Sequence, residues 1–540
     1  MTAATSRWLL ALVLLAGLGL RLHGVAFGLP ALNDPDELMF ELGSIRMLSG
    51  PTFNPGWFGH PGTTTIYLLS IVNASVFGGG WLAGWFADAK AFANAVYANP
   101  TWIILPGRLA MVGFGVLCIA LTARLGKALF GRPAGLTAAA LLAVNPLHAA
   151  WSQVVRTDIM ATAFLLLALL AAVRIAREGR WRDTVLAALW LAMAIATKWP
   201  FALGLIGIAG ALAARALSEK SSASIEGRRL ALITVLTLVL LVAISPYLVL
   251  APGAVLRDLH GEAQVHHLGA TGSGFIGNAW WYLRGPIAMG LGLAGAALVA
   301  GGVVAMREDR LAVLLLVPVP VSFFVVICAQ NLVWDRWALP LMPLLSCSAG
   351  LALAQLFALI RVRLTGSPAL ACNGLVLAVA LAAPLQQTLA HAHERLHDTR
   401  QQASAWAIAN IPRGSRVIVE HFAFDLLAQP WDFYFPMGDA GCQDARARLQ
   451  GKIKYDKIGS ARGNRSNVDY GTMPPEQRAK CSADFAIITQ YDRYAAEAEA
   501  FPVEYAAYQD LIAHGRIVAT FAPVAGSVGG PVTRIVRLSR

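Results

Sequence analysis

Charged residues are scarce in this chain of 540 residues. Asp, Glu, Lys and Arg together make up 14% of the sequence, whereas 57% of it is hydrophobic. A soluble protein of this length would have difficulty tolerating so much apolar surface. The composition therefore excludes an ordinary soluble protein and predicts a polytopic membrane protein.

Several motifs of common enzyme chemistry are also absent. The sequence has no strong internal repeat, no glycine-rich phosphate loop, no Cys/His set with metal-ligand spacing and no Ser-His-Asp signature. We therefore expect neither a metal ion nor a cofactor, and the chemistry must come from other residues.

Long apolar runs are abundant. A membrane-crossing helix needs about twenty apolar residues, and runs of roughly this length predict about eleven transmembrane helices. The run at 63–79 is ambiguous. The predicted spans are 8–28, 105–126, 133–150, 157–174, 184–199, 200–216, 230–250, 280–304, 311–329, 338–360 and 369–389.

The formal net charge of +12 could indicate nucleic acid, but the positions of the basic residues indicate membrane topology instead. Short loops rich in Lys and Arg tend to stay in the cytoplasm. We therefore place these loops and the N-terminus inside, and interpret the first span as an uncleaved anchor. The basic groups are Arg124 with Lys127 and Arg132, residues 174–182, Lys220 with Arg228 and Arg229, Arg307 with Arg310, and Arg361 with Arg363.

This topology resolves the ambiguous run. The first span leaves the cytoplasm, and the next unambiguous span, 105–126, must return to it. Residues 29–104 are therefore predicted to form one external loop. Within it, 36–48 and 61–77 are predicted as helices that lie along the outer interface. The alternative is that 63–79 crosses the membrane and 81–97 crosses back.

The same parity places residues 390–540 outside, after a transmembrane region at 1–389. This last part is polar and mixed, and its alternating apolar residues predict strands. We expect a periplasmic α/β domain. The predicted strands are 416–420, 484–489, 517–521 and 534–538.

Two of the six cysteines, Cys442 and Cys481, lie outside the membrane segments. An oxidising periplasm would allow them to form a disulfide, and two free thiols are the alternative. The other four are interpreted as small apolar fillers. They are Cys118, Cys328, Cys347 and Cys372.

Apart from the basic loops assigned to the cytoplasm, most ionisable residues of the membrane region lie at the predicted outer end, and the centres of the spans carry almost none. An ion-coupled transporter usually needs such groups near the midplane, whereas an enzyme acting on a lipid head group needs them at the interface. The residues at this end are Asp34, Asp36, Glu37, His60, Arg108, Arg156, Asp158, Lys198, Arg284, Asp335 and Arg336.

A second external loop, 251–279, contains three histidines and several glycines. These histidines could bind a metal, but the favoured interpretation is that the loop forms a lid. They are His260, His266 and His267.

The order of several short motifs resembles the membrane glycosyltransferases of the GT-C superfamily, family 39. This family includes the protein O-mannosyltransferases and the aminoarabinose transferases. The family's His-Pro-Pro element reads His-Pro-Gly here. The motifs are Asp36-Glu37, His60-Pro61-Gly62, Arg108-Leu109, Asn145-Pro146 before Ser152 and Asp158, Ala196-Thr197-Lys198, Arg336 to Pro340, and the segment 405–417.

The resemblance implies a GT-C fold and a defined reaction. A sugar would pass from a polyprenyl-phosphate donor to an acceptor lipid, glycan or protein, with inversion, at the outer face of a bacterial inner membrane. The rival hypotheses are a flippase or transporter of lipid-linked sugars, and an oligosaccharide ligase or polymerase that uses a diphosphate carrier.

This reaction needs a carboxylate as general base, and Asp36 is the first candidate. Glu37 and Asp158 are further catalytic candidates. The alternatives are structural: Asp36 as a helix cap, Glu37 as a residue of the first helical turn, and Asp158 as a stabiliser of a helix N-terminus.

The leaving phosphate needs fixed cations. Arg108 and Lys198 are the candidates for donor phosphate binding, and for both of them snorkelling to the interface is the alternative. His60 and Arg336 are additional candidates, and a structural role is favoured for His60.

Overall fold

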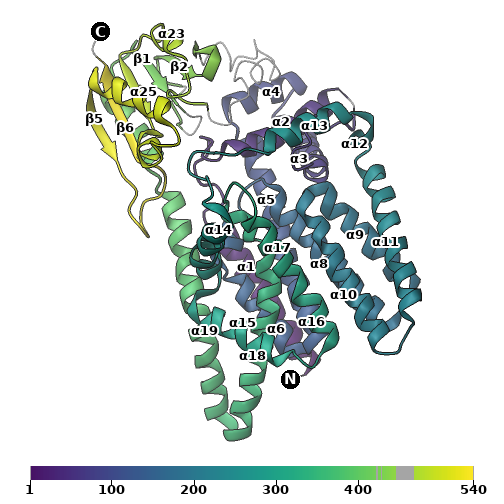
Figure 1. Ribbon diagram of the computed structural model, residues 1–540. Helices are drawn as coiled ribbons and strands as arrows, with labels where there is room; N and C mark the ends of the chain where they lie inside the picture. The colour runs from purple at the N-terminus through teal and green to yellow at the C-terminus, as the bar shows by residue number, and fades with distance from the viewer. Residues whose placement is uncertain (1, 51, 421–423, 427, 445–467, 539–540) are drawn as a thin grey trace.

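The computed structural model describes residues 2–50, 52–420, 424–426, 428–444 and 468–538. Long helices form a bundle, and a small sheet lies beyond one end of it (Figure 1). The N-terminus lies toward the opposite end of the bundle from this sheet (Figure 1). This arrangement agrees with a chain that begins on one side of a membrane and ends on the other.

Ten helical segments of the described chain are long and apolar enough to cross a membrane. Two predicted spans fall below that length, because α6 has 12 residues and α9 has 17. The bundle consists of α1 (Ala3–Leu22), α5 (Thr101–Phe130), α6 (Arg132–Ala143), α7 (Pro146–Trp151), α8 (Thr157–Glu178), α9 (Trp181–Thr197), η1 (Trp199–Leu203), α10 (Gly204–Leu217), α11 (Ala223–Ile244), α14 (Gly274–Tyr282), η2 (Leu283–Ile287), α15 (Ala288–Ala305), α16 (Arg310–Leu316), α17 (Pro318–Cys328), η3 (Asp335–Ala338), α18 (Leu341–Arg363) and α19 (Gly366–Leu396).

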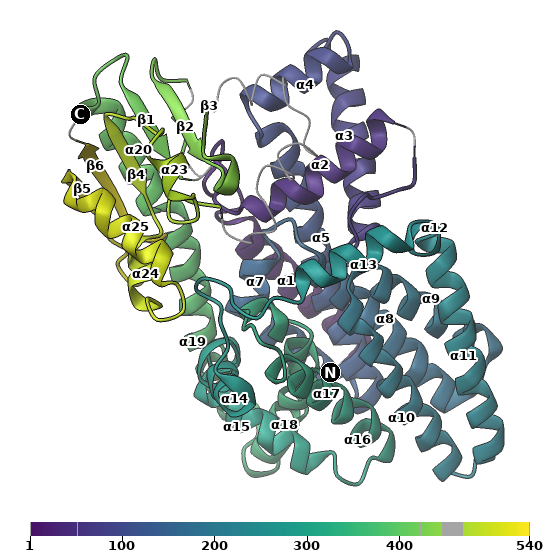
Figure 2. The same cartoon turned by 45° about the horizontal axis from the view of Figure 1, so that its top comes forward.

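A second group of helices lies across the bundle end that faces the sheet (Figures 1 and 2). It includes α2 and α3, the two helices predicted in the first external loop. Although α3 is long enough to span a membrane, both views place it with this outer group. The group consists of α2 (Pro35–Ser49), α3 (Thr63–Leu82), α4 (Ala89–Ala98), α12 (Tyr247–Leu250) and α13 (Pro252–Glu262).

The third predicted span is broken between α6 and α7. Pro146 cannot continue the ladder of helical hydrogen bonds, and Asn145 caps the new helix by accepting the His148 N–H at 2.9 Å. The break leaves carbonyl groups at the end of α6 without helical donors.

Arg21 of α1 supplies those donors from inside the bundle. Its fully buried guanidinium donates to the carbonyl oxygens of Ala143 at 2.9 Å and Leu142 at 3.2 Å. It also donates to Gly17 O at 2.9 Å and contacts His148 Nδ1 at 2.8 Å. A buried arginine thus joins the first span to both halves of the broken helix.

The C-terminal region contains a six-stranded sheet in the order β3-β2-β1-β4-β6-β5. β1 is parallel to both β2 and β4, and the remaining pairs are antiparallel. All four predicted strands are present, whereas β2 and β3 were not predicted. The elements are α20 (Thr399–Asn410), β1 (Arg416–Val419), β2 (Asp432–Pro436), η4 (Gly438–Ala440), β3 (Cys442–Asp444), α23 (Pro475–Arg478), β4 (Phe485–Ile488), α24 (Tyr491–Ala496), α25 (Pro502–Ala513), β5 (Gly515–Phe521) and β6 (Thr533–Leu538).

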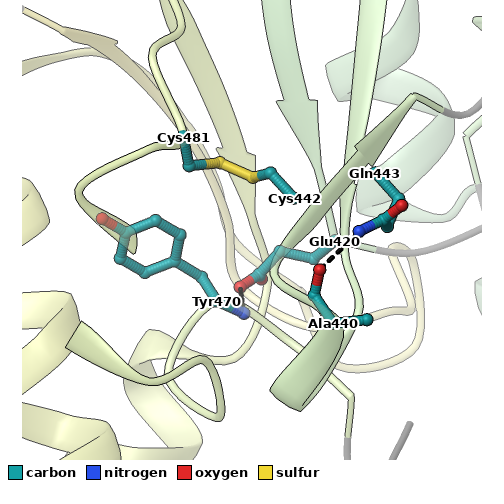
Figure 3. Close-up of a disulfide and its surroundings, with 6 residues drawn as sticks. All are labelled: Glu420, Ala440, Cys442, Gln443, Tyr470 and Cys481. Atoms are coloured by element: carbon teal, nitrogen blue, oxygen red, sulfur yellow. Dashed lines mark hydrogen bonds between the residues drawn. A yellow bond between two sulfur atoms is a disulfide. The ribbon is translucent and has the colours of Figure 1, made fainter. Parts of the chain in front are cut away.

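Cys442 and Cys481 form a disulfide with their Cα atoms 5.5 Å apart (Figure 3). Two buried carboxylates, Glu420 and Asp469, lie in the same region. Glu420 follows β1 and accepts hydrogen bonds from the Tyr508 hydroxyl and from backbone N–H groups, including that of Thr489 at 2.6 Å.

Asp469 accepts a hydrogen bond from the Tyr494 hydroxyl at 2.7 Å. Burial, and then the nearby charge of Glu420, raise the pKa of Asp469 to about 7. Neutral donors therefore satisfy both carboxylates, and burial favours the protonated form of Asp469 at acid pH.

Candidate functional site

Two motifs from distant parts of the sequence pair through their backbones. Pro61 and Lys198 form an antiparallel bridge. The Trp199 N–H donates to His60 O at 2.7 Å, and the Gly62 N–H donates to Thr197 O at 3.2 Å. The start of α3 and the turn after α9 are thus held together at the end of the bundle that faces the sheet (Figure 1).

Lys198 forms an ion pair with Asp158 of α8. Lys198 Nζ lies 2.5 Å from Asp158 Oδ1, and both side chains are almost completely buried. Within the described part of the chain, no hydrogen-bond partner meets the second oxygen of Asp158, Oδ2. The pair therefore retains an acceptor oxygen for another group.

Arg156, which precedes α8, joins two carboxylates at the start of α2. Its guanidinium lies 2.9 Å from Asp34 Oδ1 and 2.6 Å from Asp36 Oδ2. Asp34 also caps α2 by accepting the Asp36 N–H at 3.1 Å. The Asp36 side chain remains 48% exposed, so a substrate can reach it.

Opposing effects act on Asp34. Burial disfavours its charged form, but the charges of Arg156 and Arg336 outweigh that effect and lower its pKa. Asp34 is therefore ionised at neutral pH and balances the charge of Arg156.

Arg336 has a different environment from Arg156. Its guanidinium lies over the ring of Trp334 at 4.3 Å and near that of Trp151 at 5.6 Å. Its Nε atom is buried, and among the described residues no oxygen accepts a hydrogen bond from the guanidinium. Arg336 thus offers hydrogen-bond donors to an anion near Asp36 and Asp158, whose charges act on it.

Glu37 and Arg108 form a closed pair beside this cluster. Both side chains are 0% exposed, and two hydrogen bonds of 2.8 and 2.7 Å join them. Arg108 also donates to the carbonyl oxygens of Val25 and Phe27, and Glu37 accepts the Val155 N–H. The contacts of this pair are structural, and its charges are occupied by protein groups.

His60 is packed between aromatic rings. The ring centroid of Trp57 lies 5.0 Å away and that of Phe40 lies 6.1 Å away. Burial, followed by the charges of Lys198 and Arg336, lowers the pKa of His60 well below its ordinary value. His60 is therefore neutral at neutral pH, and packing accounts for most of its contacts.

The second external loop adds a carboxylate that sequence reasoning missed. Glu262, the last residue of α13, has its Oε2 atom 3.9 Å from His60 Nε2. The histidines of the loop have other contacts: His260 contacts Leu256 O, and His267 packs on Trp334. The useful sequence signal is the spacing of Asp258 and Glu262, which places both on one face of a helix.

The predicted residues therefore divide into two sets. One cluster contains Asp36, Asp158, Lys198, His60 and Arg336. Glu37 and Arg108 form a buried pair next to it. Sequence reasoning noted Arg156 but gave it no role. Its ion pairs with Asp34 and Asp36 connect the start of α2 to the start of α8 within the first cluster.

A comparison with protein families gives a match to part of the chain. The profile of the family described as dolichyl-phosphate-mannose-protein mannosyltransferase matches residues 89–249. This segment contains Arg108, Arg156, Asp158 and Lys198. No curated protein sequence gives a significant match.

Solved structures match over nearly the whole chain. ArnT from Cupriavidus metallidurans in the apo state is 15% identical, with a TM-score of 0.55 and coverage of 99% of this chain and 98% of that chain. The same protein bound to undecaprenyl phosphate gives 14% identity, a TM-score of 0.53 and the same coverage.

The archaeal oligosaccharyltransferase AglB from Archaeoglobus fulgidus, in complex with an inhibitory peptide and a dolichol-phosphate, also matches. It is 12% identical, with a TM-score of 0.53, and the match covers 94% of this chain and 72% of that chain. At such low identity these likenesses show the fold, and the family profile matches part of the chain. The chain has the fold of ArnT and AglB, and its residues 89–249 are similar to the mannosyltransferase family.

Proposed function

We propose that this protein transfers a sugar from a polyprenyl-phosphate donor to an acceptor at the outer face of a bacterial inner membrane. The observation that carries the proposal is the open charge cluster. An accessible carboxylate, Asp36, lies near an arginine, Arg336, whose guanidinium donors are unoccupied in the described chain. The lipid phosphates bound to ArnT and AglB support a donor of this class.

Asp36 is the proposed general base. The acceptor hydroxyl or amine attacks the anomeric carbon of the sugar and gives its proton to the Asp36 carboxylate. Arg156 holds this carboxylate at 2.6 Å and fixes its direction. A new bond from the acceptor to the anomeric carbon forms while the bond from that carbon to the phosphate oxygen breaks.

The polyprenyl phosphate leaves with the electron pair of the broken bond. Fixed cations stabilise that developing charge, because they need little reorganisation during the reaction. Arg336 and Lys198 are the proposed ligands of the phosphate, and Asp158 positions Lys198 at 2.5 Å. We leave Arg108 out of the donor site because Glu37 and backbone carbonyl groups occupy its donors.

Attack from the face opposite the phosphate would invert the anomeric configuration. With the N-terminus in the cytoplasm, the cluster and the C-terminal sheet would both face the periplasm. The acceptor would then be a lipid, a glycan or a protein of the envelope, and the reaction would need no cofactor.

The test uses the full-length protein in proteoliposomes that contain undecaprenyl-phosphate-linked sugars and an envelope extract as acceptor. Transfer releases free undecaprenyl phosphate, which mass spectrometry detects, and the product should have the inverted anomer. Passage of intact donor across the bilayer without release would instead show a flippase. Turnover of diphosphate carriers alone would show a ligase or polymerase.

A further inference from the structure

The last turn of α13 has a fixed position over the site. Asp258 Oδ2 accepts the Phe58 N–H at 2.9 Å, which anchors the helix to the first external loop. Glu262 follows four residues later on the same helical face. A Cβ atom at Gly59 would lie 2.9 Å from Glu262 Cγ, so the missing side chain allows this close approach.

Among the residues that the structure describes, Glu262 has no cationic partner at short range. The nearest basic group among the described residues is His60, at 3.9 Å. His60 is neutral at neutral pH, because burial and the neighbouring cations lower its pKa. No donor in the described chain gives the Glu262 carboxylate a hydrogen bond, and the side chain is 47% exposed.

The other carboxylates of the cluster differ from Glu262. Asp34 and Asp36 are paired with Arg156, and Asp158 is paired with Lys198. Among the described residues, Glu262 and Arg336 therefore remain as a carboxylate and a guanidinium that are not paired with an opposite charge at short range. The charges of Lys198, Asp36 and Arg336 all act on Glu262, so its carboxylate belongs to the same charged cluster as the proposed base and the proposed phosphate ligands.

If the proposed function holds, the donor sugar lies within this cluster. Its anomeric carbon must lie between Asp36 and the phosphate, so the ring must extend from there. A carboxylate repels a phosphate, but it accepts strong hydrogen bonds from sugar hydroxyl or ammonium groups. We propose that Glu262 binds the sugar of the polyprenyl-phosphate donor and helps to determine which sugar is used.

The experiment compares binding of two probes to the full-length protein in lipid nanodiscs. The first probe is undecaprenyl phosphate, and the second is a panel of undecaprenyl-phosphate-linked hexoses and an amino pentose. For Glu262→Gln, we expect unchanged affinity for undecaprenyl phosphate. Affinity for the preferred sugar-linked probe should fall about tenfold or more, as for the loss of a hydrogen bond to a charged group. Glu308→Gln is the control, because Glu308 is 87% exposed in a different loop.

Other outcomes would overturn the inference. An equal loss for both probes would show that Glu262 only supports the phosphate site, and no loss for either would remove it from the site. Failure of the wild-type protein to bind undecaprenyl phosphate would overturn the proposed function itself, and is distinguishable from the two results on Glu262.

Discussion

Two regions of the molecule hold carboxylates away from bulk water to different degrees, and these carboxylates have different partners. In the membrane region, Asp36 and Asp158 are held by Arg156 and Lys198. In the C-terminal sheet, tyrosine hydroxyls and backbone N–H groups satisfy Glu420 and Asp469.

The difference separates a reactive site from a structural core. In the first region an ionic substrate can replace existing partners. This cluster contains charged pairs, an exposed carboxylate and an arginine that has no acceptor among the described residues. A carboxylate enclosed by neutral donors has no such exchange available. Substitutions in the first region should therefore change activity, and those in the second should change stability.

The largest expected effect is that of Asp36→Asn. Loss of the general base should reduce the rate of sugar transfer by about 10²- to 10⁴-fold, measured as release of free undecaprenyl phosphate. The thermal unfolding midpoint should stay close to that of the wild-type protein, because the side chain is half exposed. Transfer at the wild-type rate would remove Asp36 from the role of base.

Arg108→Ala tests the closed pair that lies beside the site. Removing one partner leaves Glu37 as an unpaired buried charge, which should cost about 3–5 kcal/mol of stability. The unfolding midpoint reports this loss. The double variant Glu37→Met with Arg108→Met is the matched control and should recover much of it. A stable Arg108→Ala protein with weak undecaprenyl phosphate binding would return Arg108 to the donor site.

Removal of the disulfide should affect the second region. The double variant Cys442→Ser with Cys481→Ser should lower the stability of the C-terminal sheet by about 2–4 kcal/mol. Limited proteolysis of this region measures the change, with reduced wild-type protein as a comparison. Undecaprenyl phosphate binding should stay the same, and its loss would show that the two regions are coupled.

The smallest expected change per experimental step is a pH dependence set by Asp469, measured for each pH unit. Its folded pKa of about 7 is above its ordinary value, so the folded state binds the proton more tightly than the unfolded state. Stability should therefore fall as pH rises from about 4 to about 7, by at most about 1.4 kcal/mol per pH unit. Asp469→Asn should flatten this slope in unfolding experiments. An unchanged slope would assign it to other groups.

The sequence predicted the parts of the fold that depend on long apolar patterns. The spanning helices and the strands β1 and β4 follow from such runs. β2 ends in a proline and β3 has three residues at the edge of the sheet, so neither gives a clear local pattern. The break after α6 coincides with Pro146 but divides a run that looks continuous by hydropathy.

The site was only partly predictable because its pairing is tertiary. Asp36 and Glu37 are adjacent in sequence, but a helix turns about 100° per residue, so they face different environments. Buried residues at 37, 40, 41 and 44 share one face of α2, and this spacing was the available signal. No local pattern predicts that Arg156 would pair with Asp36 or that Glu262 would reach the site.

The buried Arg21 has a consequence for how the protein is made. Its acceptor at Ala143 lies 122 residues later in the chain, so the first span is synthesised long before that partner exists. An arginine held within a bilayer without partners is costly. We therefore expect the C-terminal end of α1 to keep this side chain near water until α6 is present to accept its hydrogen bonds.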